Sequence, residues 1–160
     1  MSINQLTNFA NKFLSENFDG MQLDIPIKIN GRLSRVLGRF RHYSAPKKPV
    51  VIELSKNMIQ YYELEEILDV LKHKLVHYAL YMQGKPHRDG DAYFENKLKE
   101  LGITATKVYK HKGKVEVYAC GCDTYEYNRK LHNHSRYKGS NYTCRCCEQP
   151  LRYVGQKIVK

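Results

Sequence analysis

Hydrophobic positions repeat with helical spacing in three segments of the chain. From residue 3 to 18 they form one stripe, which predicts an amphipathic helix (Ile3, Leu6, Phe9, Ala10, Phe13 and Leu14). From residue 63 to 82 the apolar positions cover more than one stripe, so this helix should be buried on most sides. A third helix is expected over 93–103. Gly84 and Gly102 fit the left-handed position that ends a helix.

Short β-compatible runs lie between the first two helices. Segments 21–30, 31–43 and 47–54 predict about three strands, because Asn-Gly and Ser-Ala-Pro sequences favour turns between them. No acidic residue occurs between Asp24 and Glu53, which makes one edge or face of this sheet positive (Lys28, Arg32, Arg35, Arg39, Arg41, Lys47 and Lys48). A solvated surface and a phosphate-binding surface both account for this charge. The pattern predicts an α+β domain over residues 1–106, with helices on a small three-stranded sheet.

The length and charge of the chain restrict the other possibilities. Its 160 residues suit one compact core with a small appended module, which is expected at 107–160. There is no secretory leader pattern, and no apolar run approaches the roughly 20 residues of a membrane span, so we expect a cytoplasmic protein without a membrane partner. The net charge is +11, and residues 107–160 hold 12 Lys or Arg against 4 Asp or Glu. This bias favours a nucleic acid partner.

All five cysteines occur after residue 119, and their clustering favours metal ligation over a disulfide scaffold. Two pairs separated by 21 residues predict a zinc-ribbon-like module with Cys120, Cys122, Cys144 and Cys147 as ligands, which leaves Cys146 over. His132 or His134 can replace one of these cysteines. Free buried thiols without zinc are the alternative.

Basic and aromatic residues alternate around these cysteines. Arg129, Lys130, Arg136 and Lys138 are interleaved with tyrosines, a combination in which rings stack on bases and cations follow phosphates. We therefore predict that these four residues bind nucleic acid. Packing of tyrosines in a small module explains the aromatic residues nearly as well.

The buried helix carries two histidines at a spacing that suits one metal ion. His73 and His77 are four residues apart, so both imidazoles project from one helix face, and coordination is one way to satisfy them in an apolar segment. His87 follows ten residues later as a third candidate, and three protein ligands with one open position are typical of catalytic zinc. Lys74 stands where a zinc hydrolase needs a glutamate base. His42 and His111 are expected at the surface.

The order of these motifs resembles one family over nearly the whole chain. "GRLSRVLGRF", "VVIEL", "HKLVH", "HRDGDAYF", "YACGC" and "NYTCRCCEQPL" together are similar to the SprT-like metalloproteases. The resemblance implies a zincin-like fold, zinc ligation by His73, His77 and His87, and a groove for extended protein substrates along a sheet edge. It also implies an activity linked to DNA and to DNA-bound proteins. The family motif is HExxH, from which this chain departs at Lys74.

The sequence therefore predicts a SprT-like protein with two Zn²⁺ sites, one of catalytic type and one structural. Because an ammonium cannot accept a proton, peptidase activity should be absent or strongly reduced. A second hypothesis is a non-enzymatic nucleic-acid-binding module in which these histidines and cysteines serve structure only. A third is an enzyme that still cleaves slowly through electrophilic zinc alone.

Overall fold

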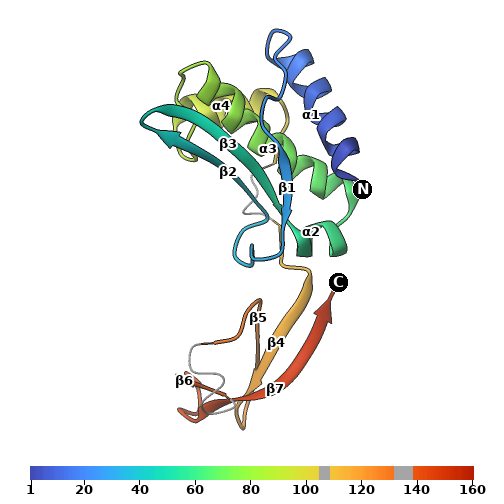
Figure 1. Cartoon of the computed structure of the whole chain (residues 1–160). Coiled ribbons are helices and arrows are strands. Elements are labelled where there is room, and N and C mark those ends of the chain that lie inside the picture. Colours follow the sequence, from blue (N-terminus) through green and yellow to red (C-terminus); the bar gives the residue numbers. More distant parts are fainter. Residues whose placement is uncertain (105–108, 132–138) are drawn as a thin grey trace. The chain divides into compact units, whose positions relative to one another are not determined.

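A computed structural model describes residues 1–104, 109–131 and 139–160 (Figure 1). The chain divides into two compact units, residues 1–110 and 111–160, and each is described by itself. The larger unit contains four helices and a three-stranded sheet, and the smaller unit contains a four-stranded sheet. The protein is thus a mixed α+β structure with small sheets.

Helix α1 (Ile3–Asn17) begins at a capping box. The Ser2 hydroxyl accepts a hydrogen bond from the Gln5 backbone N–H, and the Gln5 side chain accepts one from the Ser2 backbone N–H. These bonds satisfy two backbone donors that a helix start leaves unpaired. The helix buries Leu6, Ala10 and Leu14 completely, which confirms the predicted apolar stripe.

The first sheet has the order β1-β3-β2. Strand β1 (Ile27–Asn30) runs parallel to β3 (Lys47–Ser55), and β2 (Gly38–Ser44) runs antiparallel to β3. Three strands were expected, but β1 and β2 are shorter than their apolar runs. The chain turns after β1 because the Asn30 side chain accepts a hydrogen bond from the backbone N–H of Arg32, which starts a loop.

Three helices follow the sheet: α2 (Lys56–Tyr61), α3 (Leu64–Met82) and α4 (Ala92–Glu100). Helix α2 has only six residues, too few for a periodic pattern, and was not anticipated. Helix α3 contacts α1, α4, β2 and β3, and most of its residues are buried, as predicted. Gly84 and Gly102 have φ of +69° and +65° and end α3 and α4 as expected. After α3 the N–H of Lys85 donates to the carbonyl of Leu80, which completes a Schellman motif.

An acidic side chain of the first sheet is buried at its centre. Glu53 of β3 is 7% exposed; it accepts hydrogen bonds from Arg39 at 2.6 and 2.8 Å and from Asn30 at 3.0 Å. Burial alone raises the pKa of Glu53, but these donors outweigh it and the net pKa is lowered. The ionised carboxylate therefore stabilises the fold above its unfolded-state pKa, and this stabilisation is lost as the pH falls through the folded-state value.

We expect Glu53→Gln to reduce the free energy of unfolding of this unit by about 1–2 kcal/mol at pH 7, because the charged hydrogen bonds become neutral ones. Below about pH 4 the difference from the parent should shrink. Hydrogen exchange of the β3 amides in the full chain measures the free energy of unfolding at pH 7 and at the lower pH. Glu65→Gln, at an exposed position of α3, is the matched control and should change stability by less than about 0.5 kcal/mol. Parent-like protection of Glu53→Gln at pH 7 would contradict the prediction.

The smaller unit is an antiparallel sheet of order β5-β4-β7-β6. Its strands are β4 (Gly113–Ala119), β5 (Thr124–Tyr127), β6 (Gly139–Thr143) and β7 (Pro150–Val159). The buried residues of its core are Tyr118, Cys144 and Leu151. So small a core lies at the lower limit for a domain that folds without further support.

None of the helices that the structure describes combines the length and apolar character required to cross a bilayer.

Candidate metal centres

Helix α3 presents two imidazoles to the interior of the larger unit. His73 is 2% exposed and His77 is 8% exposed, and their ring centroids lie 5.0 Å apart. Phe94 of α4 stacks on the His77 ring at 4.1 Å and meets the His73 ring edge-on at 5.3 Å. Phe94 is fully buried and contacts both imidazole rings. The Nε2 atoms of both rings face the loop after α3.

Asp89 completes this group from the loop between α3 and α4. Its Oδ1 atom lies 3.0 Å from His73 Nε2 and 3.3 Å from His77 Nε2. The three donor atoms all lie within 4.8 Å of one another, a spacing at which one metal ion can bind them together. The sequence alone does not assign Asp89 as a ligand. The available signal was its position in the loop, twelve residues after His77.

The hydrogen bonds of His77 support a cation at this position. Its Nδ1 contacts the backbone carbonyl of His87, which only accepts, so Nδ1 carries the proton. Burial lowers the pKa of His77 to about 4, and the ring is therefore neutral near pH 7. Its Nε2 then directs a lone pair at a carboxylate oxygen of Asp89. Two acceptors at 3.3 Å repel each other, and a metal ion bound to both would remove the repulsion.

His73 and Asp89 have shifted pKa values for related reasons. Burial, followed by the charge of Lys74, lowers the pKa of His73, and Asp89 and the backbone of Thr104 oppose this shift. Burial raises the pKa of Asp89, but the hydrogen bond from His73 leads a set of contacts that lowers it overall. His73 Nδ1 is buried and has no hydrogen-bond partner of good geometry within the described part of the chain. The group is thus a neutral pair of imidazoles beside an ionised carboxylate.

Lys74 is buried next to this group. It is 8% exposed, and burial lowers the pKa of its ammonium while the charge of Asp89 opposes the shift. In the described residues no hydrogen bond or ion pair joins the Lys74 ammonium to another side chain. A lysine at this place cannot serve as a proton acceptor while it is charged.

The ring of His87 is directed elsewhere. It meets the rings of His42 and Tyr81 edge-on, each at 5.2 Å between centroids. The structure therefore groups Asp89 with His73 and His77, and ligation by His87 stays a prediction. His42 is half-buried, and its Nδ1 lies in the interior, so only part of the side chain has the expected surface position. The cause is tertiary, because Tyr81 of α3 packs on the His42 ring at 4.5 Å. His111 is likewise half-buried.

A cleft of about 330 Å³ opens beside the His73/His77/Asp89 group. Ten residues line it, of which three are Lys or Arg, three are histidines and one is acidic (Val36, Gly38, Arg39, Phe40, His42, Lys74, His77, His87, Arg88 and Asp89). Four of these residues, 38, 39, 40 and 42, belong to β2, one of the two edge strands of the first sheet. The cleft thus lies between a sheet edge and the histidine-bearing helix.

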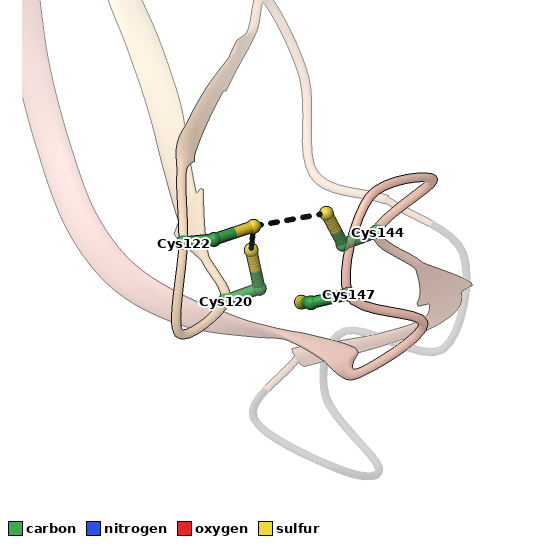
Figure 2. A group of neighbouring side chains, drawn as sticks. All are labelled: Cys120, Cys122, Cys144 and Cys147. Carbon is green, nitrogen blue, oxygen red and sulfur yellow. Dashed lines mark hydrogen bonds between the residues drawn. The ribbon is translucent and has the colours of Figure 1, made fainter.

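Four cysteines of the smaller unit point toward one another (Figure 2). The sulfur atoms of Cys120, Cys122, Cys144 and Cys147 all lie within 4.8 Å of one another, with 3.5 Å from Cys120 to Cys122 and 3.6 Å from Cys122 to Cys144. Sulfur atoms at about 2.3 Å from a tetrahedral ion are about 3.8 Å apart, so the group fits one such metal. Cys146 is exposed and lies outside the group.

Hydrogen bonds favour the thiolate at Cys144, whereas hydrogen bonds to the sulfurs of Cys120, Cys144 and Cys147 raise the pKa of Cys122. The backbone N–H groups of Asp123 and Cys146 donate to the sulfurs of Cys120 and Cys144, both at 3.3 Å. The Tyr125 hydroxyl lies 3.2 Å from Cys144 Sγ, and this contact is the largest cause of a Cys144 pKa lowered to about 6. Metal ions bind the thiolate form, so these donors prepare the site for a cation.

The predicted nucleic-acid-binding residues are only partly described. Arg129 and Lys130 are exposed just after β5. Arg136 and Lys138 lie outside the described residues, as do the alternative ligands His132 and His134. Their binding to nucleic acid stays a prediction.

Fold and sites together define a class of protein: an α+β domain with a candidate metal centre on its most buried helix, followed by a unit with a four-cysteine group. The SprT-like family matches residues 3–114, which is most of the chain, and the chain belongs to this family.

Individual relatives agree with this assignment. A SprT-like protein from Streptococcus sanguinis is 28% identical over 149 residues, which cover 92% of this chain and 95% of the relative. One from Anoxybacillus flavithermus is 31% identical over 106 residues, covering 64% and 68%. One from a Geobacillus strain is 29% identical over 102 residues, so the match spans 63% of that relative.

Proposed function

We propose that this protein is a zincin-like metallopeptidase-type protein whose catalytic base is replaced, so that it binds zinc and protein segments but cleaves them slowly or not at all. The observation that carries the proposal is the group of His73, His77 and Asp89 beside a cleft at a sheet edge. Membership of the SprT-like family supports the same reading.

Zinc is the metal that the donor sets favour. Two imidazoles with a carboxylate are typical of catalytic zinc with one open position, and four thiolates are typical of structural zinc. A zinc ion at the first site would supply Lewis-acid chemistry toward a peptide carbonyl and a water molecule. His73 and His77 would hold it with Asp89, and His87 is the alternative third ligand. Phe94 keeps both rings in position.

Lys74 separates binding from turnover. A peptidase of this type needs a carboxylate to take a proton from the attacking water and return it to the leaving amine. An ammonium performs neither transfer, and a neutral amine beside a cation would tend to coordinate it. We therefore infer that this protein binds its substrates and hydrolyses them slowly or not at all.

The partners we propose are DNA and proteins bound to it. A peptide segment can add to the free edge of β2 by main-chain hydrogen bonds, which places its side chains over the cleft. Arg129 and Lys130 are exposed in the unit that carries the cysteine group, and their charges suit contact with DNA phosphates.

Metal analysis of the purified chain tests the two sites. We expect two zinc ions per chain in the parent and one in the His73→Ala/His77→Ala double variant, because each imidazole supplies a ligand of the same ion. Asp89→Ala should also lose one ion, whereas His87→Ala should keep both if Asp89 is the third ligand. An unchanged zinc content in the double variant would overturn the catalytic-type site.

A further inference from the structure

The cleft beside the histidine group has an excess of positive charge that the metal site does not use. Among the basic side chains of the cleft, Arg39 donates hydrogen bonds to Glu53 at 2.6 and 2.8 Å. Asp89 is the acidic residue of the lining, and its carboxylate contacts His73 and His77. Lys74 and Arg88 remain, and within the described ranges neither side chain has an acidic partner at ion-pair distance.

The position of Lys74 indicates a ligand rather than a solvated surface. A lysine that is only 8% exposed loses most of its hydration, and buried charges are usually paired. Asp89 contributes a favourable charge interaction but already faces two imidazoles. A metal ion bound there would add positive charge to the cleft, so an anionic group is favoured with or without metal.

The size and walls of the cleft suit a carboxylate carried by a peptide. About 330 Å³ accommodates one or two side chains, and Phe40 and Val36 supply apolar contact for a short aliphatic stem. The His42 and His87 rings form part of the wall, with His42 Nδ1 as a buried polar atom that has no partner among the described residues. Strand β2, which is an edge strand of the described first sheet, contributes Arg39, Phe40 and His42 to this lining.

We propose that this cleft selects peptide segments with an acidic side chain, whose carboxylate binds Lys74 and Arg88. The proposal rests on the proposed function, in which a peptide lies along β2, and it names the class of residue that the segment presents. Lys74 thus acts as a specificity-determining residue at the position where a peptidase would hold its base.

The test uses the full chain and three labelled extended peptides. All three are acetylated at the N-terminus, and the first two are amidated at the C-terminus. One peptide has a single central Glu, a second has Gln there, and a third has Gln and a free C-terminal carboxylate. Fluorescence anisotropy at 0.15 M salt is repeated with the His73→Ala/His77→Ala double variant, which excludes coordination of the carboxylate by a metal ion at this site and leaves the four-cysteine group intact. We expect the Glu peptide to bind about tenfold more tightly than the Gln peptide. Tighter binding of the third peptide instead would assign the pocket to a chain terminus and overturn side-chain selection.

Substitutions then locate the preference. Lys74→Met keeps the side-chain volume and removes the charge, so it should abolish the preference for Glu. Arg88→Gln should reduce the preference for Glu severalfold. Because Arg88 is exposed, this substitution should leave the packing of the core unchanged. Lys99→Met, exposed on α4, makes the same charge change as Lys74→Met outside the cleft and should leave the preference intact. Retention of the preference in both cleft variants would overturn the proposal.

The peptide-binding results separate acidic selection from peptide binding by the cleft. Equal binding of the Glu and Gln peptides overturns acidic selection and leaves the proposed peptide cleft standing. No binding of any peptide overturns both. Thermal unfolding of each variant accompanies the binding data, so that loss of binding by a misfolded chain is recognised.

Discussion

Replacing Lys74 with glutamate is expected to create chelator-sensitive proteolysis of a DNA-bound protein, stimulated by DNA. A positioned general base contributes roughly 10²–10⁴ to the rate, so the gain over the parent should be of this order. The change places a carboxylate on α3 next to His73, in the helix turn that also carries His77. It also removes a positive charge beside the two imidazoles, which should strengthen binding of a metal cation.

Lys74→Gln is the matched control for this experiment. Glutamine has the length of glutamate and also removes the ammonium, but it cannot accept a proton. It should bind zinc as well as Lys74→Glu does and remain at the parent level of cleavage. A Lys74→Glu variant that binds two zinc ions and is as inert as the parent would contradict the proposed catalytic ancestry or the proposed substrate.

Replacing Cys144 with serine is expected to unfold the smaller unit and to release its metal. Among its described residues, the buried core cluster of this unit consists of Tyr118, Cys144 and Leu151, which is too little apolar core to stabilise about 50 residues without support. Structural zinc contributes about 10–16 kcal/mol of apparent binding free energy in small metal domains, and this binding is coupled to folding. Cys144 also accepts hydrogen bonds from Tyr125 and from the backbone of Cys146.

Cys146→Ser offers a matched control two residues away. Cys146 is exposed and its sulfur lies outside the four-cysteine group, so this variant should keep its metal and its fold. Metal content and hydrogen exchange of the β4 and β7 amides distinguish the two variants, and the β3 amides report on the larger unit. Protected β4 amides in metal-free Cys144→Ser would show that the metal does not hold this sheet.

Elements encoded by neighbouring residues were predictable. The helical stripe of α1, the apolar pattern that predicts burial of α3 and the glycines that end α3 and α4 are properties of neighbouring residues, and all appear in the structure. The grouping of Cys120 and Cys122 with Cys144 and Cys147 followed from their spacing. Helix α2 was missed because six residues carry too little periodicity.

By itself, the sequence determined that two histidines share a face of a buried helix and that Lys74 stands between them. Only the tertiary structure decided which group completes the site and what lines the cleft. Phe94 of α4 packs on the two imidazoles, the following loop brings the Asp89 carboxylate to them, and the His87 ring turns toward His42 and Tyr81. Helix faces follow from a fixed number of residues per turn, whereas the path of a loop depends on packing between distant elements.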